Sequence, residues 1–132
     1  MRKVFLFITL LGFVMILISC AMNETKLKES GAKLLSRQDL MEFFKVERVV
    51  SWKHKQVSGK SYYFPNRTQK MKWPNGGDEG EYRITRTAQI CSKWKEYRGG
   101  KEKCFRLYHN GENEYVWVNP DGSISSSMTL TK

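Results

Sequence analysis

Hydrophobic and polar residues alternate over short runs through most of the chain. From Glu47 onward no stretch keeps a helical period, and segments rich in aromatic and β-branched residues are separated by turn residues. Their short connections favour a small antiparallel meander over a Greek key. Since a flat sheet would leave two exposed edges, the fold class that we expect is mainly β, with the strands curled into a barrel or half-barrel. The eight predicted strands are Glu47–Trp52, Lys60–Phe64, Gln69–Trp73, Gly80–Thr85, Ala88–Trp94, Lys103–Tyr108, Glu114–Val118 and Ser123–Leu130.

One short α-helix is predicted before the strands, beginning at Ser36. Ser36 can cap this helix, and Asp39 stands at the spacing of a capping box. Leu40, Phe43 and Phe44 then share one face. We expect this face to be part of the core rather than a ligand groove, because a single short helix must bury its apolar stripe to persist.

The first residues of the chain are typical of a secretion signal. Arg2 and Lys3 precede an uninterrupted apolar stretch, Val4–Ile18, and small residues follow around Ser19. A helix of about fifteen residues rises about 22 Å, less than the ~30 Å hydrocarbon thickness of a bilayer, so a permanent transmembrane span is the weaker interpretation. Residues 1–19 are therefore expected to be a signal peptide.

The end of this segment, Leu17-Ile18-Ser19-Cys20, resembles the lipobox of bacterial lipoproteins. The resemblance implies cleavage before Cys20 and acylation of its thiol and amine, so that a lipid anchor would hold the protein at a membrane of the cell envelope. Because Ala21 is not Asp, it also implies the outer membrane, facing the periplasm, if the cell is Gram-negative. The polar residues that follow predict a flexible tether over 20–33 and a β domain over 34–132.

The cysteines indicate one disulfide bond. Three cysteines are an odd number, and removing the one that resembles a lipidation site leaves Cys91 and Cys104. The strands that carry them can fold back about Tyr97–Gly100, which places Cys91 opposite Cys104 and Ile90 opposite Phe105. The disulfide would lie on the polar face of this hairpin. The alternative, a pair of redox or metal-binding thiols, lacks a Cys-x-x-Cys spacing and neighbouring ligands.

The clearest turn of the chain is Asn119-Pro120-Asp121-Gly122. Asn at the first position, Pro at the second and Gly at the fourth match a type I turn. A tight reversal at this point predicts that Trp117 pairs with Ile124 and Tyr115 with Ser126.

Several segments together resemble an uncharacterised family of small secreted, disulfide-containing bacterial proteins. The running order is Gly-x-aromatic, Cys-x-x-aromatic, Cys-aromatic and then Asp-Gly, and it spans about Leu34 to Leu130. The resemblance implies an architecture and no defined activity. The segments that carry it are Gly80-Glu81-Tyr82-Arg83-Ile84, Ile90-Cys91-Ser92-Lys93-Trp94, Lys103-Cys104-Phe105-Arg106-Leu107 and Asn119-Pro120-Asp121-Gly122.

The composition supports one packed domain and offers no catalytic constellation. A chain of 132 residues, 40% of them hydrophobic, can build a single core, which excludes a multidomain machine and a wholly disordered chain. His54 and His109 are interpreted as ordinary surface or turn residues, and the acidic cluster Asp78, Glu79 and Glu81 as a solvated loop rather than a Ca²⁺ site. We therefore expect no enzyme activity, no cofactor and no metal site.

The net charge of +10 is accompanied by aromatic residues among the lysines around the predicted hairpin tip. Positive charge beside aromatic faces can bind polyanions or stack on sugars. The alternative is that the lysines only keep the strands soluble, and that Trp94 packs into the core. The candidate partner-binding residues are Lys93, Trp94, Lys95, Tyr97, Arg98, Lys101 and Lys103.

Three functions remain open at this point. The first is a lipid-anchored β module that contacts an anionic envelope polymer or a protein at the membrane surface, with nucleic acid the least expected polyanion for an exported protein. The second is a lipocalin-like binder of a small ligand, which requires a hollow barrel. The third is an inhibitor of a lysozyme-type hydrolase. The oligomeric state is not predicted.

Overall fold

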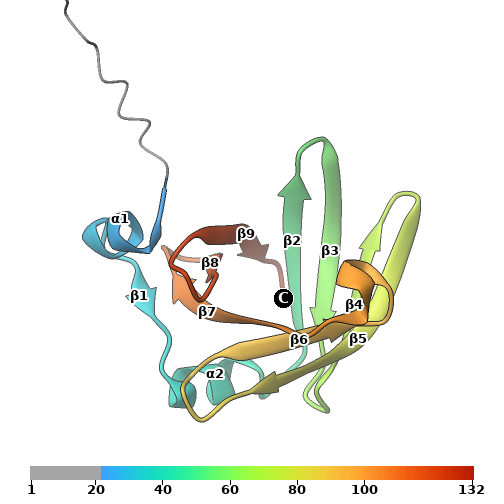
Figure 1. Ribbon diagram of the computed structural model, residues 1–132, viewed down its shortest axis with the longest axis horizontal. Helices are drawn as coiled ribbons and strands as arrows, with labels where there is room; N and C mark the ends of the chain where they lie inside the picture. Colours follow the sequence, from blue (N-terminus) through green and yellow to red (C-terminus); the bar gives the residue numbers. More distant parts are fainter. Residues whose placement is uncertain (1–21) are drawn as a thin grey trace, which may run out of the picture.

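Eight antiparallel strands run up and down in chain order and close into a barrel (Figure 1). The computed structural model describes residues 22–132, so the expected signal peptide and Cys20 lie outside the described residues. Each strand pairs with the next, and β2 pairs with β9, where Val50 lies opposite Leu130 and Trp52 opposite Met128. The predicted mainly β meander is confirmed, as a full barrel. Its strands are β2 (Arg48–His54), β3 (Val57–Tyr63), β4 (Thr68–Trp73), β5 (Gly76–Ile84), β6 (Ile90–Trp94), β7 (Lys103–His109), β8 (Glu114–Val118) and β9 (Ile124–Leu130).

A short helix closes one end of this barrel. Helix α2 (Arg37–Phe43) begins with the predicted capping box, in which the Ser36 side chain accepts from the Asp39 backbone N–H and the Asp39 carboxylate accepts from that of Ser36. At its other end the Arg48 side chain donates to the Phe43 carbonyl over 2.6 Å, and the Arg67 side chain donates to the Phe44 carbonyl over 3.4 Å. The capping box thus stabilises the start of α2, and the two arginines tie its end to the barrel.

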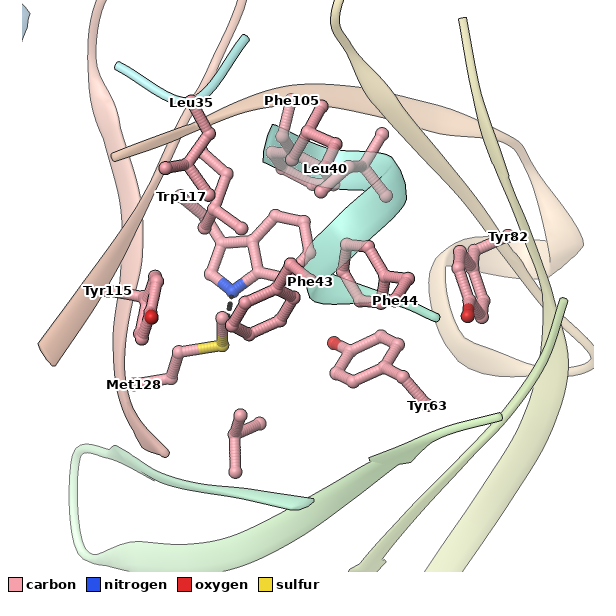
Figure 2. Close-up of a cluster of buried hydrophobic side chains, with 13 residues drawn as sticks. Leu35, Leu40, Phe43, Phe44, Tyr63, Tyr82, Phe105, Tyr115, Trp117 and Met128 are labelled. Carbon is pink, nitrogen blue, oxygen red and sulfur yellow. Dashed lines mark hydrogen bonds between the residues drawn. The ribbon is translucent and has the colours of Figure 1, made fainter. Parts of the chain in front are cut away.

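The core lies where α2 meets the barrel interior, and it is largely aromatic (Figure 2). The ring centroids of Phe44 and Tyr82 are 5.0 Å apart, and those of Phe43 and Tyr115 are 4.9 Å apart. Deeper in the barrel the Trp117 indole N–H donates to the Met128 sulfur over 2.8 Å. The apolar face predicted for the helix is thus part of the core, as expected.

The segment before α2 is folded, and the expectation of a flexible tether over residues 20–33 is wrong for its described part. Helix α1 (Glu24–Glu29) and the two-residue strand β1 (Lys33–Leu34) follow the outer wall of the barrel, and β1 pairs with β7. Leu27, only 1% exposed, packs there against Tyr108 and Val116. One leucine in a polar run gives too weak a periodic signal to predict this docking.

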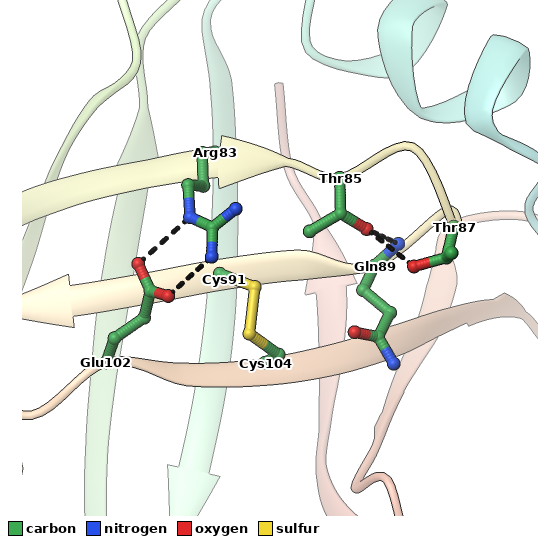
Figure 3. The surroundings of a disulfide bond; sticks show 7 residues. All are labelled: Arg83, Thr85, Thr87, Gln89, Cys91, Glu102 and Cys104. Atoms are coloured by element: carbon green, nitrogen blue, oxygen red, sulfur yellow. Dashed lines mark hydrogen bonds and ion pairs between the residues drawn. A yellow bond between two sulfur atoms is a disulfide. The ribbon is translucent and has the colours of Figure 1, made fainter.

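The hairpin of β6 and β7 has the predicted register. Ile90 lies opposite Phe105, and Cys91 lies opposite Cys104, to which it is joined by a disulfide. Figure 3 shows the disulfide on the outer face, beside the ion pair of Arg83 and Glu102, whose closest nitrogen and oxygen are 2.7 Å apart. Cys91 is 1% exposed although its strand face is polar.

The register predicted for β8 and β9 is wrong by two residues. Trp117 lies opposite Ser126 and Tyr115 opposite Met128. The turn accounts for one residue of this shift, since Val118 already lies opposite Ile124, and an irregularity between Trp117 and Val118 accounts for the other. Ile124 consequently packs with the cluster on the outer wall, not beside Trp117. A β-bulge has this effect because it inserts one extra residue into one strand.

Candidate functional site

The end of the barrel opposite α2 is open and hollow. Because successive strands alternate in direction, the turns after β2, β4, β6 and β8 all lie at this end. The hairpin tips of β2–β3 and β4–β5 rise there, far from α2 (Figure 1). A cavity of about 480 Å³ opens between them. This volume is in the range of about 300–1,000 Å³ typical of small-molecule sites. We call this cavity the cup.

Many aromatic side chains line the wall of the cup, and all four tryptophans of the chain contribute to it. Sequence analysis predicted that these residues sit on strands, but period-2 alternation does not tell whether inward side chains fill the space or leave a cavity. The wall continues into the core described above. The apolar wall residues include Trp52, Tyr63, Met71, Trp73, Trp94, Phe105, Trp117 and Met128.

Trp52 owes its position to a glycine on the neighbouring strand. Gly59 lies directly opposite Trp52, and a Cβ atom at Gly59 would stand 2.2 Å from the indole ring. The indole N–H donates to the Ser61 hydroxyl over 2.9 Å. Only glycine leaves room for the ring to lie against β3 in this orientation.

A few polar groups are set among these apolar residues. Ser61 and Ser92 are buried and line the cup, and the Ser92 hydroxyl donates to the Gln69 side chain over 3.4 Å. Gln69 in turn donates to the Glu81 carbonyl over 3.0 Å. Burial strongly raises the pKa of the Tyr63 phenol, which therefore stays protonated. The cup thus combines a large apolar surface with a few hydroxyl groups.

The loop between β6 and β7 forms one side of the cup mouth. It contains the 3₁₀ turn η1 (Tyr97–Gly100), in which Arg98, Gly99 and Gly100 all have positive φ angles. The Asp78 carboxylate on β5 accepts hydrogen bonds from the backbone N–H groups of Glu96 and Tyr97, at 3.1 and 2.8 Å. Although burial raises it, these backbone hydrogen bonds keep the net pKa of Asp78 below its ordinary value. Of the acidic cluster Asp78, Glu79 and Glu81, Asp78 therefore anchors this loop.

Arg98 turns from this loop toward the cup. Its guanidinium carbon lies 4.9 Å from the centroid of the Tyr97 ring and 5.1 Å from that of Phe105. The side chain lines the cavity and is partly buried. An arginine stacked on aromatic rings keeps the N–H groups at its edge available as donors.

The structure places the seven predicted partner-binding residues in two environments. Trp94, 6% exposed, points inward, which agrees with the alternative that it packs in the interior. Arg98 and the exposed Tyr97 also line the cup, and the Lys103 ammonium lies 5.3 Å from the centroid of the Phe105 ring. The others, Lys93, Lys95 and Lys101, are exposed. As a partner surface they stay a prediction.

Other titratable groups of the described residues have structural surroundings. His109 stacks on Tyr115 with ring centroids 4.7 Å apart, while His54 lines the cup mouth. Among residues 22–132, the one grouping with a metal-ligand arrangement is Cys91, Glu102 and Cys104, and both of its sulfurs belong to the disulfide. No charged side chain in this part of the chain is fully buried.

Comparisons of the chain with protein-family models, with curated proteins and with solved structures find no match. The resemblances to lipoproteins and to a family of small secreted proteins therefore stay predictions. Between residues 22 and 132, no helix has the length and apolar character needed to cross a membrane.

Proposed function

We propose that this protein binds a small amphipathic molecule in the cup while a lipid at Cys20 anchors it to a membrane. The observation that carries the proposal is the cavity of about 480 Å³ at the open end of the barrel, walled by aromatic side chains. Burying an apolar ligand against such a wall is favourable by about 25 cal/mol per Å² of surface removed from water. Of the three functions considered from sequence, the cavity favours the lipocalin-like binder.

Binding rather than catalysis fits the chemistry of the cup. Its polar groups are serine hydroxyls, a protonated tyrosine and basic side chains at the mouth. These groups can orient a ligand by hydrogen bonds and charge. A nucleophile held against a positioned base is the arrangement that catalysis would need. The proposal therefore assigns the cup no reaction and no cofactor.

The start of the folded chain supports a membrane source for the ligand. Asn23 forms a β-bridge with Ser123, and the Glu24 backbone N–H donates to the Gly122 carbonyl over 2.9 Å. Both contacts are on the β8–β9 turn, which is at the same end of the barrel as the cup. Cys20 precedes Asn23 by three residues, which span at most about 10 Å. A lipid at Cys20 would thus hold the open end close to the bilayer.

The exposed lysines of the mouth fit the same orientation. Lys53 and Lys55 lie at the tip of β2–β3, and Lys95 and Lys101 flank η1. Close to a membrane these side chains would face anionic head groups, each worth about 1 kcal/mol of attraction. In this proposal, the anionic partner predicted from the sequence is the membrane surface.

A neutral fluorescent probe tests the proposal directly. We expect N-phenyl-1-naphthylamine to bind the purified protein saturably, with a rise in its emission on entering the apolar cup. Ser126→Trp adds bulk to the wall of the cup from β9, and its exposed neighbour in Ser127→Trp is the matched control. Affinity should fall at least about ten-fold in S126W, because an overfilled site must displace the probe or strain its wall. Affinity in S127W should change less than about two-fold, since that position lies outside the cup.

The proposal fails if the probe does not bind saturably to the unmodified protein. It also fails if both tryptophan variants bind as the unmodified protein does. In that case the probe would occupy some other apolar surface.

A further inference from the structure

We infer that the molecule held in the cup carries an anionic group, a carboxylate, sulfonate or phosphate, which the guanidinium of Arg98 binds. This inference rests on the proposed function and adds the chemical class of the ligand. It starts from the contacts of Arg98, which leave a positive charge at an apolar wall without an ion-pair partner among residues 22–132.

The backbone of Arg98 has a conformation that is energetically unfavourable for a residue with a Cβ atom. Its φ angle is 59°, in the left-handed region that residues with a Cβ atom rarely adopt. Gly99 and Gly100 follow in the same region, so the chain makes a tight reversal at the mouth. The Asp78 carboxylate secures the entry to this reversal through the Glu96 and Tyr97 N–H groups. The loop thus presents the arginine side chain to the cup from an anchored backbone.

The Arg98 side chain contacts aromatic faces. Within residues 22–132 Arg98 takes part in no salt bridge, and its side chain makes no hydrogen bond to another residue. The two rings that it contacts, Tyr97 and Phe105, are neutral. A guanidinium has five N–H donors, and stacking on rings uses none of them. An anion with two oxygens can accept two of these N–H groups side by side.

Two carboxylates near the loop, those of Asp78 and Glu102, are committed elsewhere. Asp78 accepts from the loop backbone, and Glu102 forms a two-point ion pair with Arg83 on the outer face of the barrel. The Lys103 ammonium lies 5.3 Å from the centroid of the Phe105 ring that Arg98 also contacts, but Lys103 does not itself line the cup. A bound anion would satisfy the donors of Arg98.

A pair of probes that differ by one charged group tests the inference. N-phenyl-1-naphthylamine is neutral, and 1-anilinonaphthalene-8-sulfonate has the same ring system with a sulfonate added. The unmodified protein should bind the sulfonate at least about ten-fold more tightly than the neutral probe, the factor expected for a charge-assisted hydrogen bond. In Arg98→Gln this preference should shrink to less than about three-fold, and saturable binding of the neutral probe by the same variant reports that the cup is intact.

A matched variant controls for the overall charge of the protein. Arg86 is exposed in the turn between β5 and β6, at the closed end of the barrel. Arg86→Gln removes the same charge as R98Q and should leave the preference within about two-fold of the unmodified protein, because exposed charges are screened over about 8 Å at physiological salt.

Three results would overturn the inference. They are equal binding of the two probes by the unmodified protein, an undiminished preference in R98Q, and an equal loss of preference in R98Q and R86Q. In each of these the neutral probe still binds, so the proposed function survives. If the unmodified protein bound neither probe, the proposed function itself would be contradicted. If R98Q fails to fold, the comparison of the two probes on the unmodified protein decides alone.

Discussion

Glu24 in α1 and Arg106 in β7 form a two-point ion pair between residues 82 positions apart in the chain. The Glu24 carboxylate also accepts a hydrogen bond from the Tyr108 hydroxyl over 2.6 Å. Together with the contacts of Asn23 and Glu24 to the β8–β9 turn, this pair holds the start of the folded chain at the open end of the barrel. One partly buried carboxylate therefore contributes to fixing the position of the cup relative to the N-terminal segment.

Removing the charge of Glu24 should loosen that segment. In Glu24→Gln we expect the free energy of unfolding to fall by about 1–3 kcal/mol, since Arg106 loses its ionic partner in a partly buried site. Glu29→Gln, an exposed change in the same helix, should cost less than about 0.5 kcal/mol. Urea unfolding of the three proteins gives these differences. Equal stability of E24Q and the unmodified protein would show that the ion pair does not hold the segment.

The same pair predicts a pH dependence. The hydrogen bond from Arg106 lowers the pKa of Glu24, against an opposing effect of burial, and Tyr108 lowers it further. A depressed pKa stabilises the fold above the unfolded-state value of about 4.3, and this contribution is lost as the pH falls through the folded-state value. The stability difference between the unmodified protein and E24Q should thus be full at pH 7 and shrink below about pH 4. A difference that stays constant down to pH 3 would contradict this assignment.

Gly59 should be essential for the shape of the cup. A Cβ atom at this position would meet the Trp52 ring and, at 2.6 Å, the Lys72 carbonyl. In Gly59→Ala we expect a loss of about 1–3 kcal/mol of stability and a changed tryptophan emission, because the indole must move. Ser58→Ala, next to it on β3 and exposed, is the control. Binding of N-phenyl-1-naphthylamine should weaken in G59A only, and unchanged binding would mean that Trp52 is not a wall of the site.

The Cys91–Cys104 disulfide should contribute about 3 kcal/mol, as expected for a loop of its size. Cys91→Ala combined with Cys104→Ala should lower the melting temperature, and a reducing agent should lower that of the unmodified protein by a similar amount. The reducing agent should have no effect on the double variant. A titration that finds both thiols free in native material would contradict the pairing.

The mass of the intact protein tests whether Cys20 carries a lipid anchor. Intact-mass measurement of membrane-extracted protein should find a chain that begins at Cys20 and carries acyl chains. Cys20→Ser should give unprocessed precursor or released soluble protein. A mature chain with an unmodified Cys20 would remove the anchor and, with it, the membrane-facing orientation of the cup.

The barrel and parts of its local chemistry can be predicted from the sequence where single residues have strong structural preferences. The capping box of Ser36 and Asp39 and the facing pair Cys91 and Cys104 are examples, because side-chain chemistry and turn position each allow one arrangement. Along β9, by contrast, consecutive serines give no apolar pattern from which a register can be chosen, so the shift against Trp117 was missed.

The cup itself was the hardest feature to predict. Alternation places Trp94 on the inner face, but whether a cavity remains depends on the total volume of side chains from eight strands. The inward path of Arg98 depends on its left-handed backbone, which favours glycine and gives no sequence signal at an arginine. Such features follow from packing among distant residues, and local patterns do not encode them.

The most direct test of the account is to watch the tryptophans of the cup during ligand addition. In a two-dimensional NMR titration with N-phenyl-1-naphthylamine, the indole N–H signals of Trp52, Trp73 and Trp94 should shift saturably at one common affinity. The backbone signals of Arg83 and Glu102, which lie beside the disulfide on the outer wall, should stay in place. Shifts confined to the outer wall, or indole signals that do not move at saturating probe, would contradict the cup as a binding site.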